Sequence, residues 1–144
     1  MPRHPVIVSI ALLLAGLLLA ACGAASKQPD KVPLASASIL PIQMQEAPFA
    51  VRTAYQFAVA NPDALANVPC YCGCGAMGHT SNLSCYVKEV DADGKPVFED
   101  HALGCSICVD ITQDVMKMTG EGKSPSTIRQ QIVATYSKFG PANQ

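Results

Sequence analysis

The chain has 144 residues, enough for one domain of modest size. Charged residues make up 15% of the sequence and the formal net charge is −1, so the charge balance gives no reason to expect nucleic acid as a partner. Aromatic residues make up only 6%, and tryptophan is absent, whereas seven cysteines is a high number for this length. The cysteines are therefore the compositional feature that a function has to explain.

Residues 1–21 have the pattern of a secretory signal. A short polar start with Arg3 and His4 precedes an apolar run over residues 6–21, and Cys22 follows directly. The Leu-Ala-Ala-Cys sequence at residues 19–22 resembles the lipobox of bacterial lipoproteins. That resemblance implies cleavage before Cys22, diacylation of its thiol, and attachment to the bacterial cell membrane on the extracytoplasmic face. The alternative is an uncleaved transmembrane anchor, and in both cases the domain faces an oxidising space.

Residues 22–47 mix alanine, serine and proline without helical or strand periodicity. This composition predicts a flexible tether that carries the lipid at Cys22 and holds the following domain away from the membrane. From residue 48 the pattern changes, and we expect a mainly α, cysteine-rich domain over residues 48–140. Its architecture is predicted to be a small three-helix bundle with a cysteine-rich loop and an irregular β-hairpin.

The first two predicted helices follow from apolar residues spaced by three and four. The first begins at Pro48 and ends near residues 61–62, where Asn61 can cap one further turn. The second spans about residues 104–119, and its apolar stripe consists of Ile107, Ile111, Val115 and Met118. Between these helices, two β-favouring runs flank Asp93-Gly94 and predict the hairpin.

The third helix has an explicit start and stop. Gly120 and Gly122 end the preceding helix, Ser124 can cap the next one, and Pro125 suits its first turn. Its predicted buried stripe consists of Ile128, Ile132, Tyr136 and Phe139.

Six of the seven cysteines and two of the three histidines belong to this domain. The cysteines form a C-x-C-x-C loop, a single position and a C-x-x-C pair at a helix start: Cys70, Cys72 and Cys74, then Cys85, then Cys105 and Cys108. The histidines are His79 and His101. Gly73 and Gly75 are expected to let the loop turn so that several sulfurs converge on one point.

Converging thiolates with nearby imidazoles suit a soft or borderline metal ion, and C-x-x-C spacing fits two ligands on one metal. Cu(I) is favoured by thiolate and thioether donors, for which Met77 is also available, and Zn(II) is the alternative. We therefore expect a metal-binding protein, more readily than an enzyme, that delivers metal to extracytoplasmic metalloenzymes or buffers it for them. The predicted ligands are Cys70, Cys72, Cys74, Cys85, Cys105, Cys108, His79 and His101.

Two other uses of the thiols remain open. An even number of cysteines in an oxidising space is also typical of a disulfide-stapled structural module, although cysteines two positions apart are poorly placed to bridge each other. A thiol–disulfide oxidoreductase or redox carrier is the other alternative, because the Cys105 thiol stands at the positive end of a helix dipole.

The segments PCYCGCG (residues 69–75), GHTSNLSCYV (78–87) and HALGCSIC (101–108) resemble the bacterial PCYCGC-motif lipoproteins, a family without an assigned biochemical role. The resemblance covers about residues 69–139.

Residues 105–140 have a second, weaker resemblance. The C-x-x-C pair, a helix, EGKS and a helix ending in TYSKFG are similar to thiol-oxidoreductase subunits of bacterial cytochrome c maturation. Those are membrane-tethered three-helix domains that reduce the haem-binding thiols of apocytochromes. This implies Cys105 and Cys108 as a redox pair and a cytochrome as partner, while the four additional cysteines depart from that pattern.

Overall fold

The structure is a computed structural model that describes residues 31–144, so the predicted signal and Cys22 lie outside the described residues. The mainly α fold class is confirmed. The α-helices of the described part are α2 (Ile42–Gln45), α3 (Phe49–Ala60), α4 (Pro62–Ala66), α5 (Ser106–Gly120) and α6 (Pro125–Tyr136), and the strands are β1 (Val87–Val90) and β2 (Pro96–Phe98). None of the helices in this part of the chain has the length and apolar character needed to cross a membrane.

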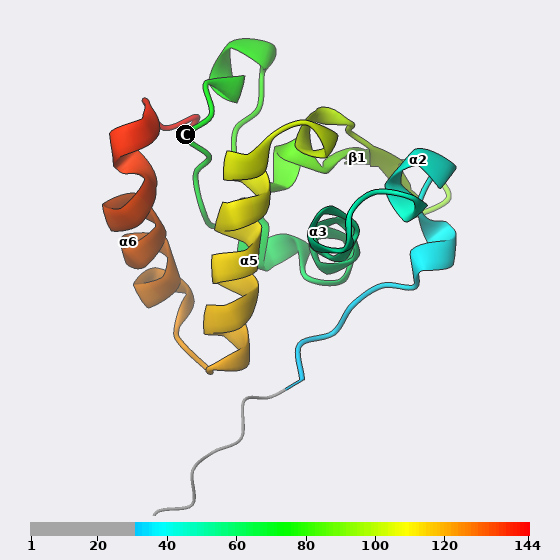
Figure 1. The fold of residues 1–144 in the computed structure, drawn as a ribbon, viewed down its shortest axis with the longest axis horizontal. Coiled ribbons are helices and arrows are strands. Elements are labelled where there is room, and N and C mark those ends of the chain that lie inside the picture. Colours follow the sequence, from blue (N-terminus) through cyan, green and yellow to red (C-terminus); the bar gives the residue numbers. More distant parts are fainter. Residues whose placement is uncertain (1–30) are drawn as a thin grey trace, which may run out of the picture.

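The three longest helices form the predicted small bundle. Helix α5 packs between α3 and α6; Figure 1 shows α5 and α6 side by side, while α3 is seen end-on and crosses α5. Their facing side chains are almost completely buried, and they make up the centre of the core: Tyr55, Phe57, Ile111, Val115 and Ile132. Removal of this apolar surface from water is the main driving force that holds the three helices together.

The start and stop signals between α5 and α6 act as predicted. Gly122 adopts a left-handed φ of 72° just after α5, which glycine does at no steric cost. The Ser124 hydroxyl accepts a hydrogen bond of 3.2 Å from the Thr127 backbone N–H, and Pro125 occupies the first turn of α6. This tight connection makes α5 and α6 an antiparallel hairpin.

Two local predictions are wrong. Phe139 is 52% exposed, because α6 ends at Tyr136 and a short 3₁₀ turn over Ser137–Phe139 rotates the ring away from the core. Asn61 does not cap α4 with its side chain; its amide instead donates to the carbonyls of Pro33 at 2.8 Å and Phe57 at 3.1 Å. Asn61 therefore ties the chain before α2 to the end of α3.

The packed part of the chain begins before residue 48. Leu40 and Met44 are 3% and 1% exposed, and α2 lies against α3. The apolar character of these side chains explains this order, because their burial offsets the entropy of fixing the segment.

The hairpin around Asp93-Gly94 is confirmed, and it is irregular as expected. Strands β1 and β2 pair antiparallel with a register shift between Val87 and Glu89. The Asp91 carboxylate accepts the backbone N–H groups of Asp93 at 2.9 Å and Lys95 at 2.8 Å, which closes the turn. The hairpin returns the chain towards the start of α5.

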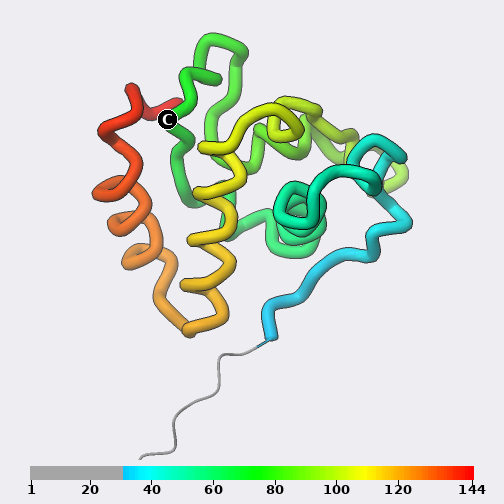
Figure 2. Tube along the Cα trace, viewed as in Figure 1, coloured from blue at the N-terminus to red at the C-terminus, as the bar shows by residue number. Residues whose placement is uncertain are grey.

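The cysteine loop lies at that same end of the bundle. The tube in Figure 2 shows the loop, drawn in green, above the first turn of α5 and beside the C-terminal end of the chain. The Asn143 backbone N–H donates to the Cys70 carbonyl at 3.1 Å, which fixes the contact between these two distant segments.

Candidate metal centre

The sulfurs of the cysteine loop meet the sulfurs at the start of α5. Cys70 Sγ lies 3.5 Å from Cys108 Sγ, and Cys72 Sγ lies 3.6 Å from the same atom. Cys74 Sγ lies 3.8 Å from Cys85 Sγ at the other side of the loop. Three segments that are far apart in sequence therefore bring their thiols to one region.

All six cysteines of the described residues are free. The shortest of the observed sulfur contacts, between Cys105 and Cys108, is 3.0 Å. A disulfide bond is only about 2.05 Å long, so this contact is not a bond. Residues 31–144 therefore contain no disulfide in this structure.

The sulfur spacings match those of metal ligands. Two thiolates bound at about 2.3 Å to one tetrahedral ion lie about 3.8 Å apart. Cys74 and Cys85 have that separation, and Cys70 and Cys72 come close to it at 3.4 Å. The cluster can therefore hold a metal ion without a large rearrangement.

The ligand atoms fall into two groups, in each of which all atoms lie within 4.8 Å of one another. The inner group contains sulfur only: Cys70, Cys72, Cys74 and Cys85. The outer group contains three sulfurs and one imidazole: Cys72, His101, Cys105 and Cys108. Of the eight predicted ligands, only His79 belongs to neither group.

The two groups differ in burial. Cys70, Cys74 and Cys85 of the inner group are at most 1% exposed. His101 and Cys105 of the outer group are only half-buried, as is the Cys72 that both groups contain. The outer group is thus the side of the cluster nearer to solvent.

The two glycines of the motif have different functions. Gly73 adopts a left-handed φ of 83°, which reverses the chain between Cys72 and Cys74. Gly75 does not have a positive φ and lies inside the 3₁₀ turn over Cys74–Met77. A Cβ at Gly75 would stand 3.4 Å from the Asn143 Cα, so the C-terminal segment lies directly against the loop at this position.

Asn143 holds the cysteine loop in place. Its Oδ1 accepts the Cys70 backbone N–H at 2.7 Å, and its Nδ2 donates to the Ser81 carbonyl at 3.1 Å. The same Nδ2 lies 3.5 Å from Cys74 Sγ, where an N–H donor favours the thiolate form. Sequence reasoning missed Asn143, because a polar residue after a Gly-Pro helix stop carries no local signal of a distant partner.

A buried polar network fixes the first turn of α5. The Cys108 carbonyl accepts the Tyr86 hydroxyl at 2.9 Å and the Asn82 amide at 3.3 Å. The Thr112 hydroxyl lies 2.7 Å from both Asn82 Oδ1 and the Tyr86 oxygen, and all three side chains are 0% exposed. These contacts hold the Cys108 sulfur against the loop, and only the fold reveals them.

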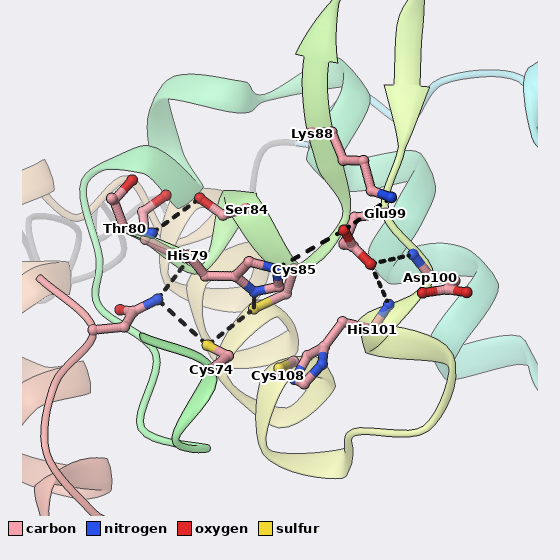
Figure 3. A network of polar contacts seen from close by, with 12 residues as sticks. Cys74, His79, Thr80, Ser84, Cys85, Lys88, Glu99, Asp100, His101 and Cys108 are labelled. Carbon is pink, nitrogen blue, oxygen red and sulfur yellow. Dashed lines mark hydrogen bonds and ion pairs between the residues drawn. The ribbon is translucent and has the colours of Figure 1, made fainter. Parts of the chain in front are cut away.

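His79 lies between a cluster sulfur and a carboxylate, as Figure 3 shows. Its Nδ1 is 3.6 Å from Cys85 Sγ, and its Nε2 is 3.9 Å from Glu99 Oε2. Glu99 also pairs with Lys88 at 3.4 Å and accepts the His101 backbone N–H at 3.3 Å. One carboxylate that sequence reasoning did not identify thereby positions both histidines.

The thiols share their protons unequally. The hydrogen bond from the Cys108 thiol lowers the pKa of Cys70 far below its ordinary value, and the same contact raises the pKa of Cys108. Burial raises the pKa of Cys72 and Cys74. Metal binding to the protonated thiols among them has to release protons.

Comparison with known proteins gives one match. A family model described as "Protein of unknown function with PCYCGC motif" matches residues 11–143, a span that includes both ligand groups. No curated protein and no solved structure matches the chain.

Proposed function

The chain belongs to the family of proteins of unknown function with the PCYCGC motif, and we propose that it is a membrane-anchored, extracytoplasmic metal-binding protein. It holds Cu(I), with Zn(II) as the alternative, and delivers the metal to extracytoplasmic metalloenzymes or cytochromes or buffers it for them. The observation that carries this proposal is the convergence of six free cysteine sulfurs from three separate segments at metal-ligand spacing.

The donor set supports a soft metal ion. Thiolates are the ligands that select Cu(I) and also suit Zn(II), whereas hard ions such as Mg²⁺ and Ca²⁺ take oxygen ligands. The Glu99 carboxylate faces His79 and belongs to neither ligand group.

Met77 supports the choice of copper. Its side chain is 60% exposed and lines a surface hollow of about 490 Å³ together with His79 and Glu99. A thioether is a ligand that Cu(I) accepts more readily than Zn(II) does. The hollow thus places a soft donor together with His79, whose Nδ1 lies 3.6 Å from Cys85 Sγ of the inner group.

The lipobox at residues 19–22 supports the membrane anchor. A lipid on Cys22 would leave the cluster on a short tether at the membrane surface, where metal-requiring membrane enzymes are within reach. The test is Cys22→Ser in the full chain, expressed in a bacterial host. The variant should leave the membrane fraction for the soluble extracytoplasmic fraction and keep its metal.

Elemental analysis tests the metal itself. The full chain, purified anaerobically, should carry copper or zinc, and its thiols should resist alkylation until a chelator is added. The double variant Cys70→Ser/Cys108→Ser should lose the metal, while Met77→Leu, matched in size, should keep the cluster-bound ion. A metal-free protein with all six thiols oxidised would end the proposal.

A second candidate function rests on one contact. Cys105 and Cys108 have sulfurs 3.0 Å apart, and Cys105 lines a surface hollow of about 300 Å³ with Val51, Leu103 and Val109. The half-buried Cys105 is suited to attack the disulfide of a partner protein and form a mixed disulfide. The buried Cys108 is suited to attack the Cys105 sulfur afterwards and release the partner in its reduced form. If the protein is a thiol–disulfide carrier, Cys108→Ser should trap a mixed disulfide, Cys105→Ser should trap none, and no metal should be bound.

A further inference from the structure

The two ligand groups share one residue, and we infer from this that the protein binds two metal ions side by side, bridged by the Cys72 thiolate. This inference rests on the proposed function and deepens it. It assigns the inner position to Cys70, Cys72, Cys74 and Cys85 and the outer position to Cys72, His101, Cys105 and Cys108.

One ion cannot use the whole cluster. A tetrahedral ion takes four ligands, whereas the two groups together offer seven ligand atoms, one from each of seven side chains. A single ion in the inner group would leave Cys105, Cys108 and His101 without a function, although they stand at ligand spacing. Each group by itself completes one four-ligand site.

Cys72 lies where a bridging ligand has to lie. Its sulfur is 3.4 Å from Cys70 Sγ in the inner group. It is also 3.6 Å from Cys108 Sγ and 3.4 Å from His101 Nε2, which are both in the outer group. A thiolate sulfur has several lone pairs and can bind two ions at once, which would place the ions about 3.8 Å apart if each bond is about 2.3 Å.

Charge also favours two ions. Two Zn(II) ions neutralise four of the six thiolate charges and one neutralises only two, while two Cu(I) ions neutralise two charges and one neutralises a single charge. Because three of the inner thiols and Cys108 are almost fully buried, each uncompensated negative charge there is costly. The bridged pair is therefore a better match to this set of sulfurs than a single ion.

The two positions differ in access. The inner position has sulfur ligands only, and three of its four cysteines are buried, so an ion there is enclosed. The outer position has an imidazole ligand and the half-buried Cys105, which faces a surface hollow. The outer ion is the one that exchanges with a partner, and the inner ion stays to hold the loop against Cys85.

Titration of the reduced full chain with ¹¹³Cd²⁺ tests the bridge directly. We expect two equivalents per chain and two ¹¹³Cd resonances, one typical of four sulfurs and one of three sulfurs and a nitrogen. Scalar coupling between the two resonances through a shared sulfur is the signature of the Cys72 bridge. This readout uses the unmodified sequence and does not depend on whether a variant folds.

Variants assign the two resonances. Cys74→Ser should shift or remove only the four-sulfur resonance, Cys105→Ser only the other, and Cys72→Ser should affect both and abolish the coupling. One equivalent with one resonance that both Cys74→Ser and Cys105→Ser perturb would overturn the two-ion centre and leave the proposed function standing. Binding of no Cd²⁺ at all, to a protein with free thiols, would remove the proposed function as well.

Discussion

Cys70 Sγ and Cys108 Sγ lie 3.5 Å apart although the two residues are separated by 38 positions in the sequence. The contact joins the PCYCGC loop to the first turn of α5. It also connects the inner ligand group to the outer one. Changes on either side of this contact should therefore affect the whole cluster.

Removal of this contact should weaken metal binding strongly. Cys70→Ser or Cys108→Ser replaces a buried thiolate ligand by a hydroxyl, which is a poor ligand for soft ions. We expect a loss of affinity of at least about 100-fold, more than the loss from a residue that only positions a ligand. Competition with a chromogenic chelator under reducing conditions measures it. Equal affinities of the variants and the parent protein would contradict the assignment of these two sulfurs as ligands.

Asn143→Ala should weaken metal binding by about 10–100-fold, because the amide positions Cys70 and Cys74 without being a ligand. The variant should also lose about 1–2 kcal/mol of stability, since the Cys70 backbone N–H loses its partner. Chelator competition and urea denaturation measure the two effects. Gln144→Ala is the matched control: its amide contacts the Ala66 carbonyl outside the cluster, so metal affinity should stay unchanged.

Tyr86→Phe should destabilise the metal-free protein by about 1–2 kcal/mol. The change removes a buried hydroxyl that donates to the Cys108 carbonyl and lies 2.7 Å from the Thr112 hydroxyl. Urea denaturation with and without Zn²⁺ measures it. Tyr136→Phe also removes one hydrogen bond, to Asp114, but that bond lies outside the cluster. Of the two variants, only Tyr86→Phe should lower the affinity for metal, and equal effects would contradict the positioning of Cys108 by Tyr86.

Chelation should remove metal in two phases. The outer ion, three of whose four ligands are half-buried, should leave first, and the enclosed inner ion should leave more slowly. His101→Ala should remove the fast phase and keep the slow one, and stopped-flow absorbance with a chromogenic chelator resolves the two. His79→Ala is the comparison, because His79 touches Cys85 of the inner group and should accelerate the slow phase only. A single phase in the parent protein would contradict unequal positions.

The metal-free, reduced protein should lose stability as the pH rises above about 9. The folded-state pKa of Cys72, Cys74 and Cys108 is raised from the model-compound value of 9.0. Unfolded thiols therefore release protons near pH 9 while the folded ones keep them. The contribution of these three thiols to the free energy of unfolding is thus complete below pH 9 and is lost above it.

Cys70 acts in the opposite direction below pH 9. The pKa of Cys70 is lowered in the folded state. Its contribution to the free energy of unfolding is therefore complete above pH 9.0 and is lost as the pH falls. Thermal unfolding of the metal-free protein across pH 6–11 should show a maximum near pH 9. The metal-loaded protein, in which the thiols are already deprotonated, should lack the alkaline decline. An alkaline loss of stability of equal size in the metal-free and metal-loaded proteins would show that the thiols of the cluster do not cause it.

The spacing of apolar residues and the helix start and stop signals in the sequence are sufficient to predict the three main helices. The apolar stripe at Ile111 and Val115, the Ser124 cap and the Gly122 stop are local signals, and the structure has each of them. The sequence pattern predicts that Phe139 lies in the core, because it continues the spacing of the apolar residues of α6. The pattern could not indicate that the helix ends one turn earlier.

The candidate site was predictable only in its chemical composition. The sequence supplies the thiols and imidazoles, but the division into two groups that share Cys72 depends on how the loop crosses the start of α5. Asn143, Asn82 and Glu99 could not be found, because each acts through partners that only the fold brings near.

The bond between the Cys70 backbone and the Asn143 side chain spans 73 positions, which affects the timing of assembly. During synthesis the PCYCGC loop lacks this restraint until residue 143 has been made, so its thiols are unprotected in the nascent chain. Ribosome-bound fragments that stop before residue 143 should react with alkylating agents at the loop even in the presence of metal. The centre is thus completed only after residue 143 has been made, and premature oxidation of these thiols is the hazard that this order of events creates.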